Sequence, residues 1–183
     1  YSYSPYKVEF IGHYHKIWAH RVNTLEKLSS AKDYFKGVEL DLVYNEANHF
    51  LDVYHPPKPS IGLHFSTYLG SIVNENQPYL WLDIKNLDHT NAEAILSHLK
   101  QLFHEHGYPH HKVLIETRFP QALPMFINEG FTTSYYLPYN LSQKDSTTIK
   151  TELKTIKSIL KKESSMGVSS SYKDYKLLSV HFP

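Results

Sequence analysis

The chain has 183 residues, with 19 basic and 18 acidic side chains, a formal net charge of +1, 13 histidines and no cysteine. Its length suits one domain with a single core, and the balanced charge without a basic tail argues against a nucleic-acid partner. The lack of cysteine excludes disulfides, thiol catalysis and thiolate metal sites, and no apolar run approaches the roughly 18 residues of a transmembrane segment.

Apolar periodicity predicts strands and helices that alternate along the chain. After an irregular aromatic lead over 1–15, strands are expected at 16–21, 38–44, 79–86, 112–117, 131–139 and 167–175. Helices are expected at 23–37, 61–75, 91–107, 120–130 and 146–164. In the first helix Thr24 is the expected N-cap and Gly37 the end, and we treat 49–55 as an extension of the second strand.

Strict alternation of apolar strands with helices is typical of α/β proteins with parallel strands and helical crossovers. A (β/α) barrel and a doubly wound sheet both satisfy this pattern. About six βα units can be counted, whereas a complete eightfold barrel usually needs about 250 residues. If the fold is a barrel, it is therefore expected to be one or two units short, either because it is trimmed or because it is incomplete.

Two carboxylates lie on one face of the second predicted strand. In GVELDLVY (37–44) successive side chains alternate between faces, so Glu39 and Asp41 point one way and the apolar residues between them point the other. Two like charges on a buried strand require a cation nearby. Asp83 on the next strand adds a third carboxylate, and hard oxygen ligands suit Mg²⁺ or Ca²⁺ better than zinc or copper.

Other polar side chains gather where the predicted parallel strands end, which is where α/β proteins place their functional groups. They are His20 and Arg21 after the first strand, His55 after the extension of the second, Lys85 on the third, and Glu116 and Arg118 on the fourth. A metal beside two histidines, a lysine and an arginine suits a phosphodiester substrate. The cations would hold anionic oxygens while one histidine attacks or acts as a base and the other protonates the leaving oxygen.

Three segments of the sequence carry a family resemblance. AHRVNTLEKLSSAKDYFKGVELDLVY (19–44), VYHPP (53–57) and LWLDIKN (80–86) together resemble the glycerophosphodiester phosphodiesterases of the PLC-like phosphodiesterase superfamily. That family has a histidine after strand one, Glu-x-Asp on strand two, a second histidine, and acid-x-Lys on strand three. The His-x-Val-Asn and Asp-x-Lys forms are similar to the sphingomyelinase D branch, and His-Pro-Pro is similar to the menorin-type branch.

The resemblance implies a TIM-like (β/α) barrel formed by a single domain over 1–183, with its motif core at 16–86. It also implies hydrolysis of a phosphodiester of the glycerophosphodiester or lipid head-group type. The implied residues are His20 and His55 as the catalytic pair, Glu39, Asp41 and Asp83 as ligands of Mg²⁺ or Ca²⁺, and Lys85 and Arg21 as contacts of the substrate phosphate. Asn23, Glu116 and Arg118 are additional candidates for contact with a small-molecule or lipid substrate.

Each of the less specific candidates has a structural alternative. In these alternatives, Asn23 caps the first helix, Lys85 only neutralises a neighbouring carboxylate, and Glu116 pairs with Arg118 at the strand end. Two alternatives to phosphodiester hydrolysis stay open: a barrel that binds without turnover, and another kind of metal-dependent hydrolase.

Two further features bear on location and ligand class. The chain begins at Tyr1 rather than methionine, which indicates an N-terminal segment removed either by a signal peptidase or by truncation of the sequence. Localisation therefore stays open, with an exported protein, periplasmic or extracellular, slightly favoured over a cytoplasmic one. The 15 tyrosines indicate a surface that faces sugar or lipid, but the sequence does not place it. The oligomeric state stays open.

Overall fold

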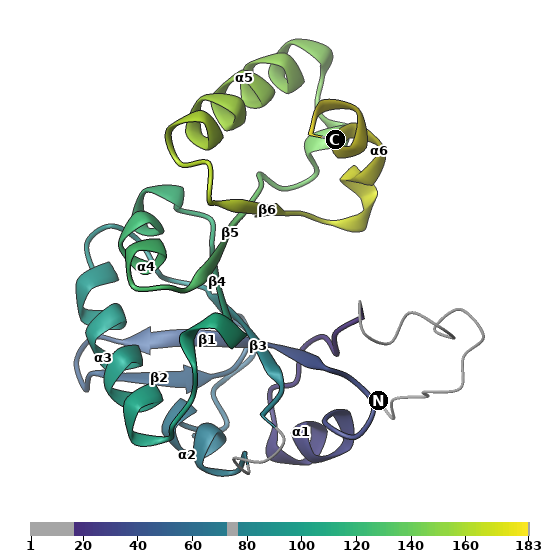
Figure 1. Ribbon diagram of the computed structural model, residues 1–183. Coiled ribbons are helices and arrows are strands. Elements are labelled where there is room, and N and C mark those ends of the chain that lie inside the picture. Colours follow the sequence, from purple (N-terminus) through teal and green to yellow (C-terminus); the bar gives the residue numbers. More distant parts are fainter. Residues whose placement is uncertain (1–16, 73–76, 183) are drawn as a thin grey trace.

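A curved six-stranded sheet forms the centre of the computed structural model, which describes residues 17–72 and 77–182 (Figure 1). The strands are β1 (Gly37–Asn45), β2 (Phe50–Val53), β3 (Tyr79–Ile84), β4 (Val113–Thr117), β5 (Thr132–Tyr136) and β6 (Gly167–Ser169). Their order across the sheet is β2-β1-β3-β4-β5-β6. All neighbouring strands pair in parallel except β2, which runs antiparallel to β1 at the edge.

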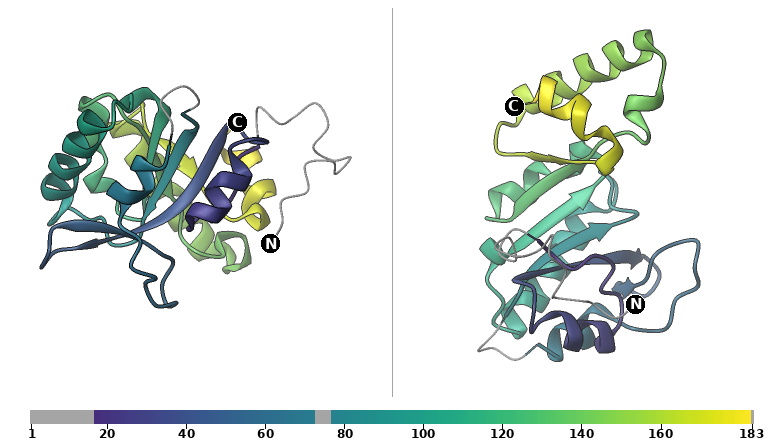
Figure 2. Two further views of the ribbon diagram at one scale, coloured as in Figure 1. Left: turned by 90° about the horizontal axis from the view of Figure 1, so that it is seen from below. Right: turned by 90° about the vertical axis from the view of Figure 1, so that its right-hand side faces the viewer.

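Helices follow the strands along the chain and lie on the outer side of the curved sheet (Figure 1). They are α1 (Leu25–Ala31), α2 (Phe65–Gly70), α3 (Ala92–Glu105), α4 (Pro124–Asn128), α5 (Ser146–Lys162) and α6 (Tyr175–His181). The views of Figure 2 place α5 and α6 near β6 at one end of the sheet and α1 at the other. Within the described residues, no helix has the length and apolar character needed to cross a membrane.

The core lies between the sheet and these helices because both present apolar residues at the matching period. On β1, Val38, Leu40 and Leu42 are fully buried, and they alternate with the carboxylate-bearing positions. On α3, Ile95 and Leu99 are fully buried and lie one turn apart, so one stripe of the helix packs on the sheet. This packing leaves the opposite face of the sheet for polar groups.

The sheet has the topology of a (β/α) barrel that does not close. The segment before α1 contributes one parallel bridge, Ala19 to Val38, on the edge of β1 that faces away from β3. In its described part, the strand expected at 16–21 is therefore reduced to this one bridge. The bridge, β1, β3, β4, β5 and β6 follow one another in chain order, so the doubly wound alternative, which needs a reversal of strand order, is wrong. Within the described residues β6 pairs only with β5. The α/β class and the incomplete barrel are therefore confirmed.

The predicted extension of the second strand is wrong. The segment 49–55 instead forms β2, which folds back antiparallel on β1 with Leu42 opposite Val53. The polar turn between the two strands reverses the chain, and His49 adopts a left-handed conformation there with φ 52°. The result is a hairpin at the edge of the sheet rather than one long strand.

The predicted end of the first helix is also wrong, although its predicted N-cap is confirmed. Thr24 accepts a hydrogen bond from the Lys27 N–H, but α1 ends at Ala31 and Gly37 opens β1. The Trp18 ring packs directly over Gly37, where a Cβ atom would lie 2.3 Å from the ring. A close approach of an aromatic ring therefore accounts for this glycine, not a helix terminus.

The last predicted strand, 167–175, is too long. β6 ends at Ser169, and the 3₁₀ turn Tyr172–Asp174 leads directly into α6. The Ser171 side chain accepts a hydrogen bond from the Lys173 N–H and caps this turn. Local capping therefore starts a helix where the sequence pattern favoured a strand.

Candidate active site

One face of the sheet brings the predicted carboxylates together because the strand register aligns them. Glu39 and Asp41 point to the same side of β1. Asp41 lies opposite Asp83 of β3, which in turn lies opposite Glu116 of β4. Asp41 and Glu116 are almost completely buried as residues. Three acidic side chains therefore stand in a row across three neighbouring strands.

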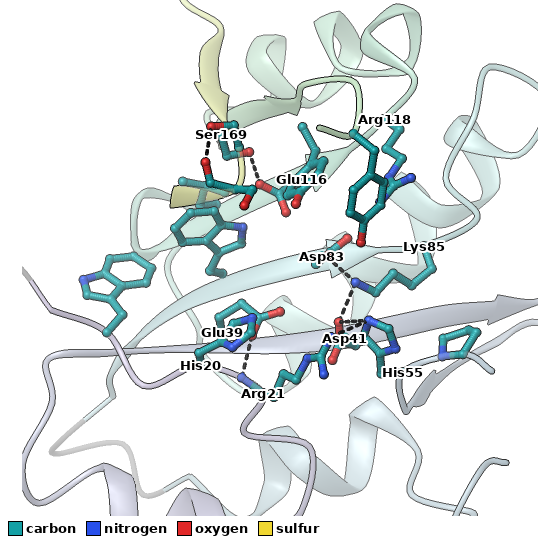
Figure 3. A pocket seen from close by; sticks show the side chains of 18 of the residues that line it. His20, Arg21, Glu39, Asp41, His55, Asp83, Lys85, Glu116, Arg118 and Ser169 are labelled. Carbon is teal, nitrogen blue, oxygen red and sulfur yellow. Dashed lines mark hydrogen bonds and ion pairs between the residues drawn. The ribbon is translucent and has the colours of Figure 1, made fainter. Parts of the chain in front are cut away.

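These side chains border an open cavity of about 1070 Å³ (Figure 3). The predicted site residues that line it are His20, Arg21, Glu39, Asp41, His55, Asp83, Lys85, Glu116 and Arg118. Asn23 is the only predicted candidate that does not line it. The structure therefore gathers residues that span nearly one hundred positions of sequence into one place.

The three residues predicted as metal ligands form a compact cluster. Glu39, Asp41 and Asp83 each offer one oxygen atom, and these atoms all lie within 4.8 Å of one another. The Lys85 ammonium lies 2.6 Å from Asp41 Oδ1 and also forms an ion pair with Asp83. Lys85 therefore does neutralise neighbouring carboxylates, as its structural alternative predicted.

The cluster becomes strongly negative when its three acidic side chains are ionised. Three carboxylates then face one ammonium, which leaves two negative charges, the amount that one divalent cation neutralises. Burial and the adjacent Asp41 raise the pKa of Glu39 to about 8, and burial also raises the pKa of Asp83 against the opposing effect of Lys85. The oxygen-rich donors and the uncompensated charge fit a hard divalent cation such as Mg²⁺ or Ca²⁺.

Asn23 fixes the position of Asp41 and does not cap α1. Its side-chain amide donates to Asp41 Oδ2 at 2.6 Å, and its carbonyl oxygen accepts from the Asp41 backbone N–H at 2.9 Å. Thr24 provides the cap of the helix instead. The helix-cap alternative for Asn23 is therefore wrong, and Asn23 supports a carboxylate of the cluster.

Arg21 connects the cluster to one of the two histidines. Its backbone is left-handed, with φ 56°, and in this conformation its N–H donates to Glu39 Oε2 at 2.6 Å. Its guanidinium lies 3.0 Å from His55 Nε2. Because arginine only donates, His55 Nε2 is the acceptor and the proton of a neutral ring resides on Nδ1.

The two predicted catalytic histidines lie beside different carboxylates. His20 Nε2 is 3.5 Å from Glu39 Oε2, and His55 Nε2 is 4.0 Å from Asp41 Oδ1 (Figure 3). Partial burial, followed by the nearby Arg21, lowers the pKa of His20. The imidazoles therefore border the carboxylate cluster from the ends of two separate loops, one before α1 and one after β2.

On the far wall of the cavity, Glu116 and Arg118 do not pair with each other. Glu116 accepts a hydrogen bond from the Ser169 hydroxyl, which in turn accepts from Ser134 at 2.9 Å. Burial and the nearby Asp83 raise the pKa of Glu116 to about 7. Within the described residues no ion pair joins Glu116 to Arg118, so that structural alternative is wrong.

Aromatic side chains complete this wall, and the sequence did not place them. The guanidinium of Arg118 lies 4.2 Å from the centre of the Tyr139 ring and 5.1 Å from that of Tyr136. Trp81 of β3 also lines the cavity. The alternation that identified Asp83 and Lys85 also puts Trp81 on their face, so the signal was present, but an apolar ring on a strand usually belongs to the core.

Comparisons with known proteins establish the fold. No family model and no curated protein matches the chain. Its structure matches a protein from Silicibacter pomeroyi DSS-3 assigned as a glycerophosphoryl diester phosphodiesterase, with a TM-score of 0.55 and 11% identity over 90% of this chain and 86% of the other. It also matches a glycerophosphodiester phosphodiesterase from Parabacteroides distasonis ATCC 8503, with a TM-score of 0.56 and 18% identity over 89% and 86%.

A third match is a protein from Galdieria sulphuraria assigned as a glycerophosphodiester phosphodiesterase, with a TM-score of 0.50 and 13% identity over 91% of each chain. The chain shares the fold of all three proteins. This likeness agrees with the family that the sequence motifs resemble. The chain spans most of the length of each of the three, so the shared fold is not confined to one part of them.

Proposed function

We propose that the protein hydrolyses a phosphodiester, of the glycerophosphodiester or lipid head-group type, with a divalent cation and a pair of histidines. The observation that carries this proposal is the convergence of three carboxylates and two imidazoles in one open cavity. The fold shared with glycerophosphodiester phosphodiesterases supports the same reaction class.

The cation would be held by Glu39, Asp41 and Asp83. A bound Mg²⁺ or Ca²⁺ supplies a positive charge that attracts the phosphodiester and offsets the charge that grows on its oxygens. The residues fit this role because their oxygen atoms converge within 4.8 Å and, when all three are ionised, carry more negative charge than Lys85 neutralises. Asn23 would keep Asp41 in place through its two hydrogen bonds.

The remaining groups supply charge and proton transfer. Lys85 and the guanidinium of Arg21 would contact the non-bridging oxygens of the phosphate. Of His20 and His55, one attacks the phosphorus or takes a proton from the attacking water, and the other donates a proton to the oxygen of the departing alcohol. Water is the final acceptor, so the products are a phosphate monoester and a free alcohol.

Metal binding tests the site without a guess about substrate. Chelator-stripped protein is titrated with Mg²⁺ and Ca²⁺ by calorimetry, beside Asp41→Asn and Asp83→Asn. We expect one ion to bind per chain and each substitution to abolish or strongly weaken that binding. Asp33→Asn, which removes an exposed carboxylate of the region after α1, is the matched control and should bind like the wild type.

Hydrolysis is then measured on glycerophosphodiesters by the release of glycerol 3-phosphate. We expect turnover that needs the divalent cation and falls at least a hundredfold in His20→Asn and in His55→Asn, because general acid–base groups typically contribute about 10² to 10⁴ in rate. Metal binding without turnover of any phosphodiester would instead favour a barrel that only binds. Absence of metal binding at millimolar concentration would overturn the metal site itself.

A further inference from the structure

The far wall of the cavity holds a guanidinium in a fixed orientation. Arg118 follows β4, and its guanidinium lies over the rings of Tyr139 and Tyr136, at 4.2 and 5.1 Å from their centres. The two tyrosines come from the end of β5 and the loop after it, so separate elements orient one side chain. Rings that cover the face of a guanidinium leave the N–H donors at its edge available to a ligand.

Arg118 has no acidic partner among the residues that the structure describes. No described carboxylate forms an ion pair with it, and the acidic side chain nearest in sequence, Glu116, is engaged by the Ser169 hydroxyl. Both Arg118 and its two tyrosines line the cavity (Figure 3). An oriented cation that faces a cavity without a protein anion is suited to an anion supplied by a ligand.

This guanidinium is separate from the cations that surround the carboxylate cluster. Lys85 and Arg21 contact Asp41, Asp83 and His55, whereas Arg118 follows β4, two strands away from β1. Because β4 neighbours β3, Arg118 lies on the Asp83 side of the cluster and its charge acts on Asp83, although no ion pair joins the two among the described residues. His20 and His55 lie beside Glu39 and Asp41 of β1, so a phosphate placed between the two imidazoles would present its substituent toward Arg118.

The same wall also offers groups that bind hydroxyls. Glu116 and Ser169 both line the cavity, and they are joined to each other by a hydrogen bond. A carboxyl group and a serine hydroxyl can each donate or accept a hydrogen bond, which suits the hydroxyls of a polyol. The far wall therefore combines a hydroxyl-binding pair with an oriented guanidinium.

The geometry points to a second anion subsite, formed by Arg118 with Tyr136 and Tyr139, that binds a negatively charged group on the alcohol portion of the substrate. The substrate class is a phosphodiester whose polyol head group carries an additional phosphate or another anionic group. A cationic head group, such as a quaternary ammonium, is disfavoured because it meets Arg118. This inference rests on the proposed phosphodiester hydrolysis and narrows its substrate.

Three substrates and two substitutions test the subsite. We would measure kcat/KM of the wild type, Arg118→Gln and Tyr139→Leu at saturating Mg²⁺ or Ca²⁺. The substrates are glycerophosphoinositol, glycerophosphoinositol 4-phosphate and glycerophosphocholine. We expect Arg118→Gln to lower kcat/KM about tenfold or more for the 4-phosphate only, since a charge-assisted hydrogen bond is lost there alone. Tyr139→Leu should give a smaller loss with the same selectivity. Lys157→Gln removes a cation that lies over the Phe182 ring away from the cavity, and serves as the matched control.

Two results would overturn the subsite. An equal loss on all three substrates would put Arg118 on the scissile phosphate, and unchanged kcat/KM on all three would remove it from recognition altogether.

A binding measurement separates the failure of this inference from that of the proposed function. If no phosphodiester is turned over, calorimetry with inositol 4-phosphate alone decides. Binding by the wild type that Arg118→Gln weakens about tenfold supports the subsite, even though the proposed hydrolysis fails. Equal affinity in both proteins, or no binding to either, overturns the subsite.

Discussion

Asp41 is held by more partners than any other carboxylate of the cluster. Its Oδ2 accepts from Asn23, its Oδ1 contacts the Lys85 ammonium at 2.6 Å, and its backbone N–H is bound by the Asn23 carbonyl. An asparagine at position 41 can satisfy only one of these neighbours with its oxygen, because its amide nitrogen is a donor like both Lys85 and the Asn23 amide. Asp41→Asn therefore disturbs the site beyond the loss of one charge.

Glu116 gives a prediction for the pH dependence of stability in chelator-treated protein. Burial and Asp83 raise the pKa of Glu116 in the folded state from 4.5 to about 7. Between these pH values the Glu116 side chain is protonated in the folded state and ionised in the unfolded state. Stability must therefore fall as pH rises through this window, by up to roughly 3 kcal/mol at 1.36 kcal/mol per pH unit. Glu116→Gln keeps an acceptor for Ser169 and removes the titration.

We accordingly expect the free energy of unfolding of Glu116→Gln to rise relative to that of the wild type as the pH increases from 4.5 to 7. Urea unfolding of both proteins across this range measures the difference. A difference that does not change with pH would contradict the assigned shift. Ser179→Ala, in the exposed last helix, controls for substitutions outside the cavity.

At the residue scale, the sequence predicts which side chains gather but not how they are held. Period-two alternation correctly places Glu39, Asp41, Asp83 and Lys85 toward the cavity. The hydrogen bonds of Asn23 to Asp41 and the left-handed backbone of Arg21 depend on the loop between 19 and 24 packing along β1. Such tertiary contacts leave no periodic signal in the sequence.

Among the elements, the start of β1 depends on its contact with Trp18. Alanine would normally be favoured over glycine within a strand, yet a Cβ at position 37 would lie 2.3 Å from the Trp18 ring. We expect Gly37→Ala to lower the free energy of unfolding by about 1 to 3 kcal/mol, the usual cost of overpacking. Denaturant unfolding measures this loss.

A second substitution attributes that loss to the ring. In a Trp18→Leu background the clash is removed, so Gly37→Ala should cost clearly less than it does in the wild type. A double-mutant cycle of the four proteins gives the coupling energy between the two positions. Equal costs in both backgrounds would show that Trp18 is not the cause.

Elements with long, regular apolar patterns are the ones that the sequence predicts well. The helix expected at 91–107 is α3, and its apolar residues are buried in the core. Short elements are decided by local contacts instead. The β2 hairpin follows from the turn at His49, and α6 follows a 3₁₀ turn capped by Ser171, so a pattern of apolar residues alone misassigned both.

For the whole molecule, cation binding should appear as stabilisation, since the cluster joins two strands of the sheet. A ligand that binds only the folded state adds about 2.7 kcal/mol when its concentration is one hundred times Kd. For a chain of this length that corresponds to a rise in Tm of roughly 5 to 10 °C. Thermal unfolding with and without Ca²⁺ or Mg²⁺ measures the shift, and Asp41→Asn should abolish it. A shift that persists in Asp41→Asn would place the ion elsewhere.

The overall architecture could be predicted as a class, and the count of βα units also indicated an incomplete barrel. Alternating strands and helices indicate parallel α/β structure, and the motif order over 16–86 favours a barrel over a doubly wound sheet. Whether the sheet closes depends on pairing between its first and last strands, which are far apart in sequence. Among the described residues, β6 pairs only with β5. A parallel sheet can therefore curve as in a barrel without closing into one.

The order of the strands divides the chain at α3. The carboxylate cluster, both imidazoles and Lys85 precede this helix, whereas Glu116, Arg118 and the two tyrosines of the far wall follow it. Genetic recombination with a crossover inside α3 would exchange Glu116, Arg118 and the two tyrosines in one event and keep every residue of the proposed reaction centre. Evolution of new head-group preferences in this architecture can therefore proceed by shuffling of C-terminal segments, without passing through intermediates that have lost their chemistry.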